Sequence, residues 1–324
     1  MMSEYVFNSV SNDGANGGLH ATKSLVVTFV ETLAELDTRL TGPARPLKLP
    51  SDPWELNITT DDDGEIISLG EVINSFYEDG QTRELATFFD ALQCYAPAVE
   101  QLDGNAIDAI LRLSADKPVQ DYESVFEAVC DAGFEAMQCV VTGGVLVSLN
   151  HGKWNFSHAL FECSGMAVAL DHASHPLHVD DLLKRAVADA RSRLTRQNFD
   201  AIRSTAFPSL IWGQDVSGQF EKFPAEYIRL AFSRLANLDD MASRWKSTGD
   251  GEPDPGSMVL RNESDLTMQN YGGDRRFRSA AGTIKTFERH VWIDKGNRIH
   301  FLLDHVNRTV EIGYVGTHLP TWNF

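Results

Sequence analysis

The sequence predicts an α+β protein in two parts, an N-terminal α/β domain of unknown fold and a small C-terminal domain with helices packed on an antiparallel sheet. Helix-like and strand-like patterns are mixed through about the first 200 residues. A long amphipathic helix and three strand patterns joined by short turns fill the final third. Of the 324 residues, 43% are hydrophobic and 23% charged, which is typical of a globular protein and excludes a disordered chain, a collagen-like fibre or a coiled-coil rod.

Residues 1–20 are rich in Ser, Asn and Gly, so we expect a mobile tail, and residues 21–200 are expected to form the first domain. An Asp-Asp-Asp-Gly turn after the strand-like run 54–59 predicts a β-hairpin. Ser68 is placed to cap the helix that follows. The other expected elements are helices over 69–77, 82–94, 121–130 and 181–194, and strands within 139–150 and 165–170.

Residues 201–324 are expected to form the second domain, beginning with a short strand over 209–212. A helix over 224–245 follows, and its apolar residues recur at steps of three, four and seven, which gives one apolar stripe. The Gly- and Pro-rich run 249–256 predicts an exposed loop. Strands are expected over 286–293, 298–303 and 309–315, with an additional strand around 275–279.

The first 18 residues lack the basic and apolar regions of a signal peptide, and the longest apolar runs are too short to cross a bilayer. The four cysteines show no CxxC spacing, so we expect reduced thiols. These features predict a cytoplasmic protein with no membrane partner.

The net charge of −18 at first argues against nucleic acid as a partner. The charge is unevenly spread, however, because residues 261–324 hold nine basic and seven acidic side chains, whereas the preceding 260 have a balance of −20. The C-terminal strands also carry four of the ten histidines. Either chance accounts for this difference or these strands form a phosphate-binding face.

The hairpin over 286–303 has a register that the alternation of its side chains predicts. If its apolar residues share one core, Val291 lies opposite Ile299 and His290 lies opposite His300. The other face then carries Glu288, His290, Trp292, Arg298 and His300. Such a set is costly for a sheet face that only meets water.

Two imidazoles and a guanidinium on one face suit RNA cleavage without a metal. One imidazole would take the proton of the ribose 2′-OH, another would protonate the leaving oxygen, and Arg298 would stabilise the charge on phosphorus. Trp292 could stack on an unpaired base, and the last strand could bring His318 nearby. Alternatively, each histidine is a structural residue, Trp292 only packs, and Arg298 pairs with Glu288 across the hairpin.

The C-terminal region resembles the C-terminal region of a group of bacterial proteins. These proteins are similar to the RelE/ParE superfamily of toxins. The resemblance covers about 120 residues. Its specific part consists of 277–282, 287–291, 298–301 and the run 312–321, which reads Ile-Gly-Tyr-Val-Gly-Thr-His-Leu-Pro-Thr. It implies a compact antiparallel sheet with N-terminal helices and a metal-independent RNase that needs no cofactor. ParE members act on gyrase, so the fold alone does not fix the reaction.

The resemblance implies a catalytic set and a phosphate- or RNA-binding set. The implied catalytic residues are His290, Arg298, His300, Tyr314 and His318, and the implied binding residues are Arg276, Arg278, Trp292 and Arg308. The expected partners are RNA, including mRNA on the ribosome, and an antitoxin or defence-system protein. Toxins of this superfamily are usually small and basic, whereas this chain has a long acidic N-terminal part.

The predicted function is therefore a toxin or phage-defence effector whose RNase domain is restrained by the acidic N-terminal domain. The alternative is a non-catalytic interaction or regulatory protein with a RelE-like fold. Two other motifs bear on function. His172, His175 and His178, with Asp180 and Asp181, predict a polar loop with a helix cap, or a zinc or manganese site. The turn at Asp61 is not a calcium loop, since Val72 occupies the position that needs a bidentate Glu.

Overall fold

The computed structural model describes residues 2–12, 18–40, 44–60, 64–95, 105, 108–109, 133–163, 166–249 and 251–322. The chain forms two compact units, Met1–Lys184 (unit 1) and Arg185–Phe324 (unit 2). Both helices and strands contribute to it, so the α+β class is confirmed. Across the ranges given above, no helix is long and apolar enough to cross a lipid bilayer.

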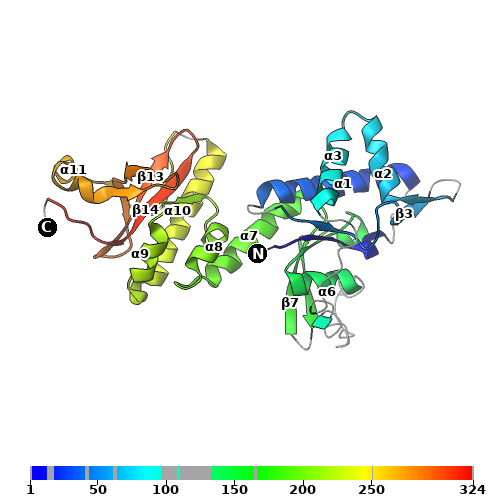
Figure 1. Ribbon diagram of the computed structural model, residues 1–324, viewed down its shortest axis with the longest axis horizontal. Helices are drawn as coiled ribbons and strands as arrows, with labels where there is room; N and C mark the ends of the chain where they lie inside the picture. Colours follow the sequence, from blue (N-terminus) through cyan, green and yellow to red (C-terminus); the bar gives the residue numbers. More distant parts are fainter. Residues whose placement is uncertain are drawn as a thin grey trace. The chain divides into compact units, whose positions relative to one another are not determined.

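Unit 1 is built on a five-stranded sheet with the order β2-β1-β5-β7-β6, of which Figure 1 labels β7. Four of its strands are parallel and β6 is antiparallel to β7. The bounds are β1 Tyr5–Phe7, β2 Leu47–Lys48, β5 Val145–Val147, β6 His158–Cys163 and β7 Met166–Ala173.

The expected tail over 1–20 is wrong for its described residues, because β1 lies inside the sheet and all three of its residues are buried; residues 13–17 lie outside the described residues. A short 3-10 helix, Ser9–Asn12, follows it, and the first long helix already begins at Gly18. A buried parallel strand needs only a short apolar run with no alternation, and the polar composition around Tyr5–Phe7 obscures that run.

Other described helices of unit 1 are α1 Gly18–Arg39, α2 Leu69–Ser75, η2 Phe76–Glu78, α3 Arg83–Tyr95, α6 Gly133–Thr142 and η3 Gly152–Trp154, and α7 Pro176–Ser192 begins in this unit and ends in unit 2. The predicted hairpin is confirmed as β3 Asn57–Thr60 and β4 Ile66–Ser68. Ser68 caps α2 as expected: its Oγ accepts the Glu71 N–H at 3.2 Å, and the Glu71 carboxylate accepts the Ser68 N–H at 2.7 Å.

Two expectations for unit 1 are wrong in part. The apolar run 139–150 begins as the end of α6 and becomes a strand only at Val145, because residues 139–142 complete the last turn of the helix. Helix α7 begins at Pro176 rather than at 181, since proline suits the first helical turn. Asp180 therefore lies inside α7, where it pairs with Arg39 at 2.8 Å, instead of capping it. The helix expected over 121–130 lies outside the described residues.

Unit 2 has a second five-stranded sheet, with the order β8-β14-β13-β12-β9. It is antiparallel except where β14 pairs with β8. Its strands are β8 Leu210–Trp212, β9 Leu260–Asn262, β12 Arg289–Trp292, β13 Asn297–Asp304 and β14 Thr309–Thr317. Its helices before the meander are α8 Phe199–Ala206, α9 Val216–Lys222, η4 Ala225–Tyr227 and α10 Ile228–Thr248.

The core of unit 2 lies between the helices and one face of this sheet. The predicted stripe of α10 is confirmed, with Ala231, Leu235 and Leu238 packed in one cluster with Ile299 and Phe301 of β13. Ala190 near the end of α7 belongs to the same cluster. The division between the units consequently falls within α7, whereas the sequence placed it near residue 200; an uninterrupted helix carries no Gly or Pro signal for such a division.

An insertion covers the other face of the sheet. It joins β9 to β12 and is here called the 263–287 insertion. It contains α11 Asp265–Tyr271, η5 Gly272–Arg275 and an antiparallel hairpin of β10 Arg276–Arg278 with β11 Ile284–Thr286. The strand expected around 275–279 is confirmed as β10. The single strand expected over 286–293 is split, because the Phe287 N–H bonds the Arg275 carbonyl at 2.8 Å instead of continuing the ladder.

Candidate functional site

The two predicted histidines of the hairpin do face each other. His290 pairs with His300 and Val291 with Ile299, which confirms the register, and the two imidazole centroids are 5.2 Å apart. The 263–287 insertion nevertheless excludes most water from this face, so His290 is 7% and His300 only 1% exposed. Trp292, two residues from His290 on the same face, stays 41% exposed at the edge of the cluster.

The insertion adds a buried ion pair that the sequence did not reveal. Arg275 is fully buried, and its Nε and Nη2 donate to the Glu263 carboxylate at 3.1 and 2.9 Å. The same carboxylate oxygen lies 3.7 Å from His290 Nδ1. Glu263 directly follows β9. The Leu-Arg-Asn sequence of this strand has no strand-like alternation, so the sequence did not predict the strand or the position of Glu263.

The structure favours neutral imidazoles in this cluster. His300 Nδ1 donates to the Phe287 carbonyl at 3.0 Å, which leaves the lone pair on Nε2. Burial, followed by the charge of His290, lowers the pKa of His300 to about 3. Burial also lowers the pKa of His290 and of His318, and the nearby Arg298 acts in the same direction on both.

Arg298 carries a buried charge that forms no ion pair with a carboxylate of the described residues, although the charges of Asp294 and Glu263 act on it from further away. It is 4% exposed, and its Nη1 donates to the carbonyls of Asp294 and Asn297 at 2.7 and 2.9 Å. Among the residues that the structure describes, it forms no ion pair, so the pairing with Glu288 weighed above does not occur. Arg298 Nε and His290 Nδ1 are buried and lack a hydrogen-bond partner within those residues. Both atoms are therefore available for a hydrogen bond to a ligand or to water.

The charge of the cluster favours an anion over a metal ion. Glu263, His290 and His300 place one ligand atom each within 4.8 Å of one another, a spacing that a metal could use. The Glu263 charge, however, is already balanced by Arg275, and Arg298 adds a further positive charge. A divalent cation would enter a positive environment, whereas a phosphate would be attracted to it.

Tyr314 and His318 complete the cluster from β14 and the segment after it. The Tyr314 ring meets His300 edge-on at 5.8 Å and stacks on Phe277 of the insertion at 4.9 Å. Its hydroxyl donates to the Thr317 carbonyl at 2.9 Å. The backbone N–H of half-buried His318 donates to the Gly296 carbonyl at 2.7 Å, which holds His318 at the Arg298 end of the hairpin. All five predicted catalytic residues thus lie in one region.

Only one of the four predicted binding residues lies beside this cluster. That residue is Trp292, whose ring centroid is 4.1 Å from the Arg298 guanidinium and 5.0 Å from the Arg261 guanidinium. Arg276 and Arg278 are exposed and alternate with Phe277, so they point away from Tyr314. Arg308 lies in the turn at the opposite end of the β13–β14 hairpin, where it donates to the Gly249 carbonyl at 3.1 Å after α10.

The three histidines considered as a metal site do not converge either. His172 is buried and within 2.8 Å of the Ser148 hydroxyl, while the Nδ1 atoms of His175 and His178 accept the backbone N–H groups of Leu177 and Ser174. Within the described part of the chain they form no metal-sized group. The expected polar loop is confirmed only at 174–175, because His172 lies in β7 and His178 lies in α7.

Comparisons of the chain with protein-family models, with curated proteins and with solved structures find no match.

Proposed function

We propose that unit 2 binds RNA and cleaves it without a metal ion, using His290, Arg298, His300, Tyr314 and His318. The observation that carries this proposal is the buried Arg298, which has no ionic partner among the described residues and lies beside imidazoles that stay neutral. Such a site gains more from a phosphodiester than from water, because the anion offers acceptors and neutralises the guanidinium.

Cleavage would proceed by transfer within the substrate. The ribose 2′-oxygen forms a bond to phosphorus and passes its proton to His318, the most exposed of the three imidazoles. The bond between phosphorus and the 5′-oxygen breaks, and this oxygen takes a proton from His290. The products are a 2′,3′-cyclic phosphate and a 5′-hydroxyl. A bound phosphodiester raises the pKa of both imidazoles, which offsets the effect of Arg298 and allows His290 to carry its proton.

His300 and Tyr314 are assigned a positioning role. The fixed Nδ1–H of His300 sets the orientation of its ring against His290, and the Tyr314 ring packs against His300 from the side. Trp292 at the exposed edge would stack on an unpaired base, so single-stranded RNA is the expected substrate.

The proposed setting is a cytoplasmic toxin or phage-defence effector of the RelE-like kind, with an antitoxin or defence-system protein as partner. This rests on the resemblance of the C-terminal motifs and on an arrangement in which helices precede a mainly antiparallel sheet. The acidic N-terminal part would act as a restraint on the RNase in the same chain.

A second candidate is a unit that binds RNA or a protein without chemistry. The burial of His290 favours this alternative, since an imidazole so enclosed passes a proton to a substrate only after the insertion moves.

Cleavage of a labelled single-stranded RNA in EDTA distinguishes the two. We expect a cyclic phosphate product from the wild type and at least about a hundredfold lower rate for His290→Ala and His318→Ala. Arg298→Met should lose both cleavage and binding. His305→Ala is the matched control, because His305 is exposed in the turn at the other end of β13. No cleavage by any protein, or equal cleavage by all, would favour the non-catalytic alternative.

A further inference from the structure

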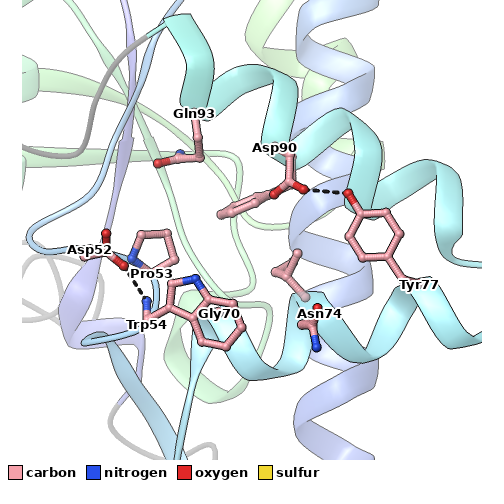
Figure 2. A pocket seen from close by; sticks show the side chains of 10 residues that line it. Asp52, Pro53, Trp54, Gly70, Asn74, Tyr77, Asp90 and Gln93 are labelled. Carbon is pink, nitrogen blue, oxygen red and sulfur yellow. Dashed lines mark hydrogen bonds between the residues drawn. The ribbon is translucent and has the colours of Figure 1, made fainter.

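Unit 1 contains a pocket of about 380 Å³ that the proposed function does not use (Figure 2). The loop before β3 contributes Asp52 and Trp54 to its wall, the α2–η2 segment contributes Gly70 and Tyr77, and α3 contributes Asp90. This volume is within the range of small-molecule sites.

The pocket is preformed around an exposed indole. Trp54 is 58% exposed although the backbone of its loop is fixed, since the Gly70 N–H donates to the Pro53 carbonyl at 2.8 Å. Asp52 accepts the Trp54 N–H at 2.9 Å. A Cβ at Gly70 would lie 2.7 Å from Trp54 Cδ2, so only glycine lets the ring rest against the start of α2. A large apolar ring held rigidly in water favours a function in binding.

The charge of the pocket defines the ligand. Its described lining holds two carboxylates, Asp52 and Asp90, and no Lys or Arg. Asp90 accepts the Tyr77 hydroxyl at 2.5 Å, and in the described ranges neither aspartate forms an ion pair. Phosphorylated ligands would be repelled, whereas a cation gains both from the carboxylates and from the aromatic faces.

We propose that this pocket binds an aliphatic di- or polyamine. Two carboxylates on different walls, one in a loop and one on α3, match two ammonium groups, and the Trp54 indole in the same pocket offers a surface for the methylene chain. Primary ammonium groups donate hydrogen bonds to carboxylates, which a quaternary ammonium cannot do.

Calorimetric titration of the full chain with spermidine and putrescine tests this. We expect saturable binding of one molecule per chain that Trp54→Ala and Asp90→Asn weaken at least fivefold each. Trp54→Phe should restore part of the affinity, since it keeps an aromatic face. Glu84→Gln is the matched control on the same helix, because Glu84 is exposed and lies outside the pocket.

Three further measurements test the ligand class and the role of the indole. Choline should bind at least tenfold more weakly than spermidine, and Mg²⁺ at equal ionic strength should not displace spermidine. Gly70→Ala, which displaces the indole without changing any charge, should weaken binding while the protein still unfolds cooperatively. Unchanged affinity in Trp54→Ala, full displacement by Mg²⁺, or equal binding of choline would overturn the proposal. None of these outcomes depends on RNA cleavage by unit 2.

Discussion

Arg275 and Glu263 form the most enclosed ion pair of the candidate site, and removing one member leaves the other charged in an apolar interior. We expect Glu263→Gln to lower the free energy of unfolding by about 3 kcal/mol. Urea denaturation of the full chain, followed by the fluorescence change of unit 2, measures this loss.

Glu288→Gln serves as the control for that substitution, since Glu288 is exposed and should change stability by less than about 0.5 kcal/mol. A similar small effect for Glu263→Gln would mean that water reaches Arg275 and that the 263–287 insertion does not enclose the site.

His300 gives the protein a pH dependence of definite sign. Its folded-state pKa of about 3 is below the ordinary value of 6.5, so the unfolded chain binds more protons between these values. Stability from this residue is complete above pH 6.5 and is lost as the pH falls toward 3. We expect a decrease of about 1 to 2 kcal/mol from pH 7.5 to pH 5 that His300→Gln lacks.

The difference between the wild type and His300→Gln isolates this effect, because Asp239, buried beside Arg191, has its pKa raised to about 6 and acts in the opposite direction. Denaturation at five pH values on both proteins provides the measurement. Parallel curves for the two would contradict a buried neutral His300.

For single residues, the sequence predicted the contacts that depend on the alternation of side chains along a strand. The pairing of His290 with His300 follows from the apolar residues between them. The sequence did not predict that Glu263 and Arg275 belong to the cluster. They reach it through the 263–287 insertion, and no regular spacing in the sequence links them to the histidines.

At the scale of elements, strand β14 requires glycine at two positions of its Gly-Tyr-Val-Gly run. A Cβ at Gly313 would lie 2.4 Å from the Phe287 ring, and one at Gly316 would lie 2.3 Å from the Tyr314 hydroxyl. Gly313 lets Phe287, the last residue of the insertion, pack against the sheet. Gly316 lets the Tyr314 side chain lie back along β14.

We expect Gly313→Ala to destabilise unit 2 by about 3 kcal/mol and to loosen the insertion. Hydrogen exchange of the β10–β11 amides should increase, and thermal denaturation should report the loss of stability. Gly251→Ala is the control, since no described atom lies within 4 Å of the added carbon. A Gly313→Ala protein as stable as this control would show that Phe287 moves aside freely.

The elements differed in how far the sequence predicted them. The last two strands of the meander, the cap at Ser68 and the stripe of α10 have strong local signals and were correct. Strand β1 and the end of α6 were missed, because a buried parallel strand and a β-branched helical turn look alike in short apolar runs.

For the whole molecule, helix α7 determines where the chain can be divided. Arg191 near its end donates to the buried Asp239 of α10 at 2.8 Å and to the Ala206 carbonyl at 2.9 Å. A fragment that starts at residue 200 lacks this arginine, whereas one that starts at 185 keeps it. We expect the longer fragment to be more stable by about 3 kcal/mol, measured by urea denaturation.

The same fragments test the proposed restraint by the acidic part. The 185–324 fragment should cleave RNA faster than the full chain, with equal loss of activity in both on His318→Ala. A fragment no more active than the full chain would remove the N-terminal part from the regulation of unit 2.

Strand β1 has a kinetic consequence. Its neighbour β5 is far away along the chain; Asn8 and Ser148, which follow the two strands and share a hydrogen bond, are 140 positions apart. The centre of the unit 1 sheet therefore cannot form on the ribosome until β5 has left the exit tunnel. By contrast, β12, β13 and β14 pair with near neighbours and can form as soon as they emerge. Until then β1 can pair only with the short strand β2, so the edge that later takes up β5 stays open, and this is the period when chaperones would be needed most.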